Sequence, residues 1–267
     1  SLRRRQRQMC IRDRYEAYLL ENDCMRNTVS TYIRRLRCIY NKAVENGDAE
    51  YIPGLFQGVF TGVESKRKKS LSLENQHKLM TVKVESEVLR ETQLVVCLLF
   101  QYAGMSFVDF AHLKERNIKN GILDYNRQKT GTPMRLEILD TAELMRKELM
   151  GDKKPASGYL FPFLSGTKTG YEAYLEYNAA LSRFNRNLKA LKKAAGIASD
   201  VTSYTIRHSF AMALKEQNVP IEMISELLGH KSIKTTQIYL RSFSLEKMTE
   251  VNSTCFGCVY NYVSKVG

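Results

Sequence analysis

The sequence from Val201 to Tyr239 reads VTSYTIRHSFAMALKEQNVPIEMISELLGHKSIKTTQIY. It predicts one helix through Arg207 and a second that begins at Pro220 and ends at Gly229, because proline is favoured at helix starts and glycine after helix ends. Three short motifs, each with one or two polar side chains, lie near the ends of these segments, where side chains can converge on one ligand. They are Arg207-His208, Leu228-Gly229-His230 and Tyr239.

An arginine, a histidine and a tyrosine together suit phosphoryl transfer through a tyrosine. Arginine binds a phosphate with two parallel charged hydrogen bonds. Histidine can donate a proton to a phosphate oxygen, and a tyrosine oxygen can attack phosphorus to form a covalent intermediate. Taken alone, an arginine is more often a surface charge and a histidine a core residue, and Tyr239 is only one of fifteen tyrosines. The prediction therefore depends on the combination.

The three motifs in this order resemble those of the tyrosine recombinase (phage integrase) family. The matching segments are Arg207-His208-Ser209-Phe210, Leu228-Gly229-His230, and Thr235-Thr236 followed by Tyr239. In that family the arginine binds the scissile phosphate, the histidine after Leu-Gly assists it, and the tyrosine attacks. The resemblance covers about residues 72–245 and implies these roles for Arg207, His230 and Tyr239.

The resemblance implies a mostly α-helical fold with a small β-sheet. We expect part of a helical core-binding (SAM-like) domain at 15–62, a linker at 63–71, and an α+β catalytic domain with a C-terminal tail at 72–267. We expect the core-binding part to be shorter than usual and the family's further N-terminal arm-binding domain to be missing.

The basic composition indicates a polyanionic partner. Lys and Arg number 41 against 28 Asp and Glu, a net charge of +13, which favours nucleic acid over a membrane surface; a merely soluble basic protein is the alternative. No apolar run approaches the roughly 18 residues of a membrane span, and no signal peptide is visible. Six cysteines in 267 residues are no disulfide framework, which fits a reducing cytoplasm. Together with this composition, the resemblance implies a bacterial cytoplasmic, nucleoid-associated protein.

Residues 1–14, SLRRRQRQMCIRDR, differ in character from the rest of the chain. They are strongly basic and show no apolar periodicity. The string resembles translated sequencing-adapter sequence, so we interpret it as a non-native or disordered segment rather than as a basic arm that binds DNA.

Two amphipathic helices with basic faces are candidates for contact with DNA. One extends from Asn27, a favourable N-cap, to Gly47, and the other from Leu175 to Ala195. The linker adds a run of four basic residues. For each segment, contact with phosphates and a solvated charged surface are both compatible with the pattern. The candidate DNA-binding residues are Arg34, Arg35, Lys66, Arg67, Lys68, Lys69, Arg186 and Lys189.

The segment AGMSFVDF at 103–110 departs from the family pattern. The family has its first catalytic arginine where this chain has Ser106, so the charge of the transition state loses the support of one guanidinium. Asp109 matches the family's acidic residue. The string Gly-Met-Ser-Phe-Val-Asp resembles integrases of Bacteroidetes mobile elements, which favours a functional variant. Arg127 and Arg135 are candidates for the compensating group because they are close in sequence.

Alternating apolar residues between Gly121 and Ile138 predict two strands joined at Thr130-Gly131. The family carries a mobile lysine on such a hairpin, where it protonates the leaving 5′ oxygen. By resemblance this lysine is Lys129.

Tyr204 stands where the family usually has a histidine, three positions before Arg207. A phenol can donate a hydrogen bond to a phosphate but is a poor base near neutral pH. We expect a supporting role at most for Tyr204, and a structural role for His208.

The resemblance implies a site-specific recombinase or integrase that cuts and rejoins double-stranded DNA through a 3′-phosphotyrosine, for integration or excision of a mobile element. The phosphotyrosine conserves bond energy, so no cofactor or metal is expected. Cys255 and Cys258 form a single Cys-x-x-Cys motif, with no second pair of ligands nearby to complete a zinc site. The expected assembly is a homotetramer on paired sites, with accessory DNA-bending proteins as further partners. A topoisomerase IB-like nicking-closing enzyme and a catalytically impaired DNA-binding relic remain alternatives.

Overall fold

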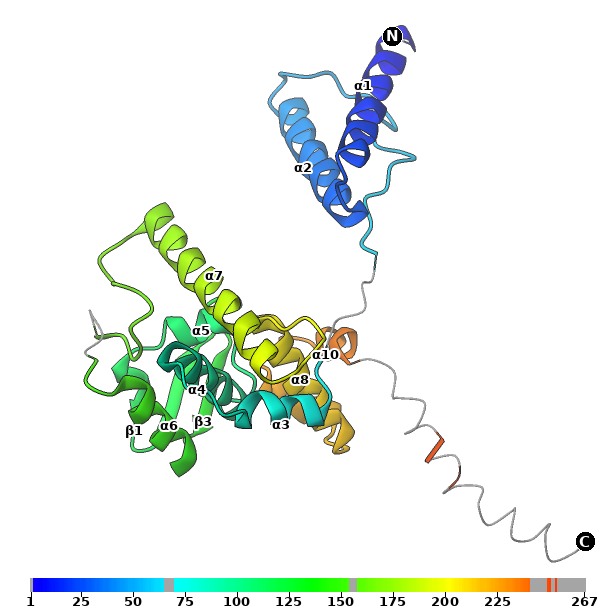
Figure 1. Ribbon diagram of the computed structural model, residues 1–267. Helices are drawn as coiled ribbons and strands as arrows, with labels where there is room; N and C mark the ends of the chain where they lie inside the picture. The colour runs from blue at the N-terminus through cyan, green and yellow to red at the C-terminus, as the bar shows by residue number, and fades with distance from the viewer. Residues whose placement is uncertain (1, 65–69, 154–157, 241–248, 251–252, 254–267) are drawn as a thin grey trace, which may run out of the picture. The chain divides into compact units, whose positions relative to one another are not determined.

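The computed structural model describes residues 2–64, 70–153, 158–240, 249–250 and 253. The chain packs as two units, Ser1–Arg67 and Lys68–Gly267. Among the described residues, the first unit holds a pair of helices, and the second holds eight α-helices, one short 3-10 helix and the small sheet. Figure 1 shows both units. This is the mostly helical fold with a small sheet that the sequence predicts.

The first unit is built on two helices, α1 (Leu2–Glu21) and α2 (Arg26–Glu45). Their contact is a small apolar core of Leu19, Val29 and Ile33. The chain after α2 folds back over this pair, where Ser30 donates its hydroxyl to the carbonyl of Gly62 at 2.6 Å. Side-chain bonds to backbone groups of this returning segment supplement the small core.

Two features of the first unit differ from the expectations above. Residues 2–14 are helical, because α1 runs without a break from Leu2, and the buried Arg12 donates to the carbonyls of Leu55 and Gln57. Asn27 does not cap α2, which begins at Arg26. Its amide instead bonds both backbone groups of Glu64, at 2.9 and 2.7 Å.

The sheet of the second unit has three antiparallel strands in the order β1-β2-β3. They are β1 (Ile118–Lys119), β2 (Ile122–Asn126) and β3 (Pro133–Glu137). The predicted hairpin is present. Its turn closes with a bond from the Arg127 N–H to the Thr132 carbonyl at 2.9 Å.

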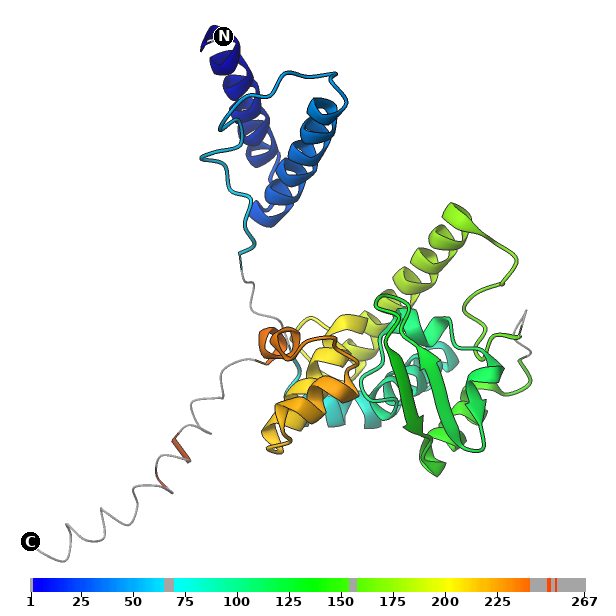
Figure 2. The same cartoon turned by 180° about the vertical axis from the view of Figure 1, so that it is seen from behind.

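The centre of the second unit is helix α4 (Glu87–Gln101), which is buried from Thr92 to Leu99. Helices α3 (Leu73–Thr81), α6 (Asp140–Met150), α7 (Gly170–Ala194) and α8 (Ser203–Glu216) all pack against it. In both views the sheet lies to one side of this helical layer (Figures 1 and 2). The long apolar run of α4 is thereby removed from water, which is the main source of stability for such a helix.

A short helix, α5 (Phe107–Ala111), is fixed by stacked aromatic rings. Phe107 stacks on Phe184 of α7 with ring centroids 4.6 Å apart, and Phe110 stacks on Phe161 at 4.2 Å. A short 3-10 turn, η1 (Glu115–Asn117), leads from α5 into the sheet. The stacking holds α5, which contains Asp109 and follows Ser106, against the core.

The last described helices are α9 (Ile221–Leu227) and α10 (Ile233–Tyr239). As predicted, Pro220 precedes α9 and Gly229 follows it with φ +59°. Ala211 of α8 packs with Ile224 and Leu228. Among the residues that the structure describes, no helix combines the length and the apolar character of a membrane span.

Candidate active site

Arg207 lies in α8 and is only 4% exposed. Its Nη1 donates to the carbonyl of Gly104 at 2.9 Å, and its Nη2 donates to the carbonyl of Leu228. Gly104 has φ +63°, and a Cβ built there would lie 2.7 Å from Cδ1 of Phe210. Glycine at this turn therefore lets the end of α4 approach α8 closely enough to hold the guanidinium.

Arg127 is a second buried guanidinium in the same cluster, at 8% exposed. Its Nη1 donates to the carbonyls of Leu228 at 3.1 Å and Gly229 at 3.0 Å. The backbone that follows α9 therefore binds both arginines. Arg135 does not join them: it is exposed on β3, opposite Asp124 in the register.

Asp109 provides the negative charge that balances this cluster. Its Oδ2 accepts from Ser106 Oγ at 2.6 Å and from Arg127 Nε at 3.4 Å, and its Oδ1 accepts the Gln128 N–H at 2.7 Å. A buried ion pair needs such additional hydrogen bonds to offset the loss of hydration. Ser106, at the position of the family's first arginine, thus holds the carboxylate that orients Arg127.

Tyr125 of β2 is a neighbour that the sequence analysis did not identify, since it fits the alternating pattern of buried strand residues. Burial raises the pKa of its phenol, the Asp109 carboxylate raises it further, and Arg207 and Arg127 oppose the rise. The phenol therefore stays protonated in the physiological pH range.

Gly229 connects α9 to His230 under tight steric limits. A Cβ built at Gly229 would lie 2.7 Å from Cδ of Arg127 and would also overlap Met134 of β3. The Arg127 side chain thus packs directly against Gly229, the glycine of the Leu-Gly-His motif, where a larger residue would collide with it.

His230 is half-buried, and its backbone N–H donates to the carbonyl of Ser225 at 2.9 Å. Its Nδ1 lies 2.9 Å from Oγ1 of Thr236 in α10. Tyr239 is the last residue of α10, three positions after Thr236. The structure thus connects the histidine of one motif with the helix that carries the tyrosine of the next.

Two of the predicted residues are exposed. Lys129 is exposed on the turn between β2 and β3, and in the described part of the chain it makes no hydrogen bond or ion pair with the cluster. Tyr204 is 49% exposed, one helical turn before Arg207. His208, by contrast, is fully buried, as a structural residue should be.

The candidate DNA-binding residues divide between the two units. Arg34 and Arg35 are exposed on α2, and Arg186 and Lys189 are exposed on α7. The four basic residues at 66–69 lie outside the described residues.

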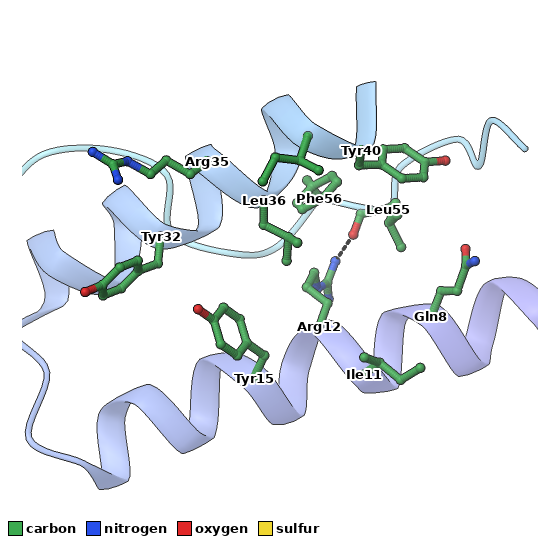
Figure 3. Close-up of a pocket in the computed structure, with 11 residues that line it drawn as sticks. Gln8, Ile11, Arg12, Tyr15, Tyr32, Arg35, Leu36, Tyr40, Leu55 and Phe56 are labelled. Atoms are coloured by element: carbon green, nitrogen blue, oxygen red, sulfur yellow. Dashed lines mark hydrogen bonds between the residues drawn. The ribbon is translucent and has the colours of Figure 1, made fainter. Parts of the chain in front are cut away.

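Arg35 stands at the edge of a groove of about 520 Å³ between α1 and α2 (Figure 3). Apolar side chains such as Ile11 and Leu36 line the groove, and the bond from Arg12 to Leu55 crosses it.

No group of three or more His, Cys, Asp or Glu side chains is placed to hold a metal ion within the described ranges. Cys255 and Cys258 lie outside those ranges, so the expectation about them stays a prediction.

Two family models match the chain. The model described as "Phage integrase family" matches residues 69–246, and the model described as "Phage integrase SAM-like domain" matches residues 9–53. The first match contains every residue of the cluster described above.

Among curated proteins, the tyrosine recombinase XerA of Pyrococcus furiosus is 32% identical over 177 residues, which are 65% of this chain and 57% of that protein. The chain spans less than two thirds of the length of the curated relatives it matches.

Two solved structures show the same fold at low identity. The Tn1549 transposon integrase in complex with circular intermediate DNA is 15% identical with a TM-score of 0.67, and the match covers 91% of this chain and 84% of that one. A lambda integrase tetramer bound to a Holliday junction is 17% identical with a TM-score of 0.65, covering 87% and 64%.

Proposed function

This chain belongs to the phage integrase family, and we propose that it is a site-specific recombinase that cuts and rejoins DNA through a 3′-phosphotyrosine. The observation that carries this proposal is the convergence of Arg127 and Arg207 on the backbone next to His230. Two preorganised guanidinium groups with an adjacent imidazole are suited to the charge of a pentacovalent phosphate.

In the proposed reaction the phenolic oxygen of Tyr239 attacks a DNA phosphorus. The bond from phosphorus to the tyrosine oxygen forms as the bond to the 5′ oxygen breaks. Arg207 and His230 hold the non-bridging oxygens. Lys129 gives a proton to the leaving 5′ oxygen, the phenol of Tyr239 releases its proton to water, and a proton from water restores Lys129, so that protons balance over the step. A 5′ hydroxyl of another strand then reverses the step. Because the number of phosphoester bonds is unchanged, the chemistry requires neither a nucleotide cofactor nor a metal.

In this proposal, Arg127 supplies the guanidinium that is missing because Ser106 stands at the position of the family's first arginine. Its Nε bonds Asp109 and its Nη1 bonds the backbone. Within the described residues nothing accepts from Nη2, whose two N–H groups can donate to a phosphate oxygen. Arg207 is anchored in the same way, to Gly104 and Leu228. Both arginines are thus oriented before the substrate arrives.

The proposed partner is double-stranded DNA, and the proposed assembly is a homotetramer on paired sites in the bacterial cytoplasm, at the nucleoid. The net charge of +13 supports a nucleic-acid partner. The tetramer of lambda integrase on a Holliday junction supports the stoichiometry by analogy of fold. Integration or excision of a mobile element, with accessory DNA-bending proteins, is the proposed setting.

Covalent trapping tests the proposal. The protein is incubated with nicked duplexes that carry the terminal sequences of its own element, and the products are separated on a denaturing gel beside those of Tyr239→Phe. We expect a protein–DNA band that the variant lacks, and transfer of the trapped strand to a second site.

Two results of this experiment would contradict the proposal. Supercoil relaxation on any DNA, without strand transfer, would indicate a topoisomerase-like enzyme. DNA binding with no covalent band would indicate a binding relic.

A further inference from the structure

Thr236 has a different environment from its neighbours on α10. Among the α10 residues whose side chains the structure describes, Ile233 to Gln237, only Thr236 is buried, at 0% exposed. Buried hydroxyl groups need a hydrogen-bond partner because losing water without one costs free energy. The partner of Thr236 is Nδ1 of His230, at 2.9 Å.

The bond joins two parts of the candidate active site that the backbone alone does not align. The backbone of His230 is fixed by the end of α9, where its N–H donates to Ser225 and the Gly229 N–H donates to Glu226. These bonds leave rotation of the imidazole ring about its side-chain torsions undetermined. The contact from Thr236 supplies a restraint on the ring, and it comes from the helix that ends in Tyr239.

The direction of the bond determines what His230 can do. A neutral imidazole donates from one ring nitrogen and accepts at the other. If Nδ1 carried the hydrogen and donated to Thr236, the lone pair on Nε2 would meet a phosphate oxygen and repel it. If the Thr236 hydroxyl donates to Nδ1, then Nε2 carries the hydrogen and can donate to that oxygen.

We propose that Thr236 is a positioning residue whose hydroxyl donates to Nδ1 of His230 and holds the ring in the Nε2–H tautomer. The same bond couples the orientation of His230 to the placement of α10 and therefore of Tyr239. The inference rests on the proposed recombinase function, but the contact itself can be tested without DNA. The adjacent Thr235 is exposed and offers a matched control.

The first test is NMR of the histidine rings in the full-length protein. The chain has four histidines, so ring-¹⁵N spectra are assignable with one substitution at each. We expect His230 to show the Nε2–H tautomer in the wild type. Thr236→Val, which keeps the shape and removes the hydroxyl, should mix the tautomers, whereas Thr235→Val should leave the spectrum unchanged. An Nδ1–H tautomer in the wild type, or no response to Thr236→Val, would overturn the proposal.

The second test is the rate of covalent trapping on the nicked duplexes, at equal DNA occupancy. We expect Thr236→Val to slow trapping about tenfold, the size of effect expected when one orienting hydrogen bond is lost. Thr236→Ser, which restores the hydroxyl but lacks the methyl group, should recover most of the rate, and Thr235→Val should match the wild type. Equal rates for Thr236→Val and wild type, or a Ser variant as slow as the Val variant, would contradict a positioning role.

The two tests also separate this inference from the function on which it rests. A wild type that traps no DNA while its ring spectra respond as expected would refute the recombinase proposal and leave the Thr236 contact established. Normal trapping with unresponsive spectra would refute the contact alone.

Discussion

The guanidinium groups of Arg127 and Arg207 share one hydrogen-bond acceptor, the carbonyl oxygen of Leu228. Like charges at this separation repel, and the pair is tolerable because Asp109 is bonded to Arg127 and because the carbonyls of Gly104, Leu228 and Gly229 are oriented toward the cations. An anion that binds between the two groups would relieve the remaining repulsion. This arrangement explains how a chain with Ser106 can retain a two-arginine site.

Replacing Arg127 tests this explanation most directly. We expect Arg127→Ala to reduce the rate of covalent trapping by about 10²- to 10³-fold, the cost of losing one preorganised donor to the transition state. The variant also leaves Asp109 buried without its cation, which should lower the free energy of unfolding by about 3 kcal/mol or more. Arg127→Lys keeps the charge but not the paired carbonyl bonds, so its trapping rate and stability should lie between those of Arg127→Ala and the wild type.

Arg135→Ala is the matched control, because Arg135 is exposed on β3 in the neighbouring part of the same hairpin. Its trapping rate and urea midpoint should equal those of the wild type. If Arg135→Ala were the slower variant, Arg127 would not be the compensating residue.

The contact between Gly229 and Arg127 predicts that Gly229→Ala is damaging for two separable reasons. The backbone has φ +59°, which costs about 1 kcal/mol for alanine. The new Cβ would also press on Sδ of Met134 and Cδ of Arg127, adding about 1–3 kcal/mol. Gly196 has φ +66° with nothing within 4 Å of its built Cβ. Gly196→Ala therefore reports the backbone cost alone, and urea unfolding of both variants gives the packing cost by difference. Equal destabilisation of Gly229→Ala and Gly196→Ala would show that Met134 and Arg127 both move aside freely.

The sequence predicts the local parts of this site well, because each depends on neighbouring residues. The helix that carries Arg207, the turn at Gly229 and the hairpin that carries Lys129 follow from periodicity and turn chemistry. What joins them does not: Arg127 reaches Leu228 across 101 positions. From proximity in sequence, Arg127 and Arg135 are equally good candidates for the compensating group. The structure distinguishes them, because Arg127 is buried in the cluster and Arg135 is exposed on the hairpin.

The same limit applies in the first unit, where the sequence alone favours a non-native or disordered segment at residues 1–14. Arg12 looks like part of an unpatterned basic string, and its burial depends on the carbonyls of Leu55 and Gln57, more than forty positions away. Charge patterns alone could not distinguish this arginine from the exposed Arg34 and Arg35.

A pH-dependent contribution to stability is expected from the pair that joins α4 to α6. Arg90 donates to both carboxylate oxygens of Glu148, at 2.7 and 3.0 Å, and these bonds lower the pKa of Glu148. A lowered pKa stabilises the fold above the unfolded-state value of about 4.3. This contribution is lost as the pH falls through the folded-state value.

Glu148→Gln should therefore destabilise the protein at pH 7, by less than about 1 kcal/mol because the pair is half exposed. The difference from wild type should shrink toward pH 3. Urea unfolding at several pH values checks this, with the exposed Glu85→Gln as control. A difference between Glu148→Gln and wild type that grows on acidification would show that ionised Glu148 does not stabilise the fold.

Lys129 is exposed on its turn, so its proposed role separates cleanly from any role in folding. We expect Lys129→Ala to unfold at the wild-type urea concentration, to bind DNA, and to trap DNA much more slowly, because the 5′ oxygen leaves poorly without a proton. A substrate with sulfur at the 5′ bridging position needs no such proton, since a thiolate is a better leaving group than an alkoxide. The variant should therefore recover on that substrate, whereas Arg207→Ala, which lacks support for the phosphate charge, should not. Equal slowing on both substrates would assign Lys129 to phosphate binding instead of proton transfer.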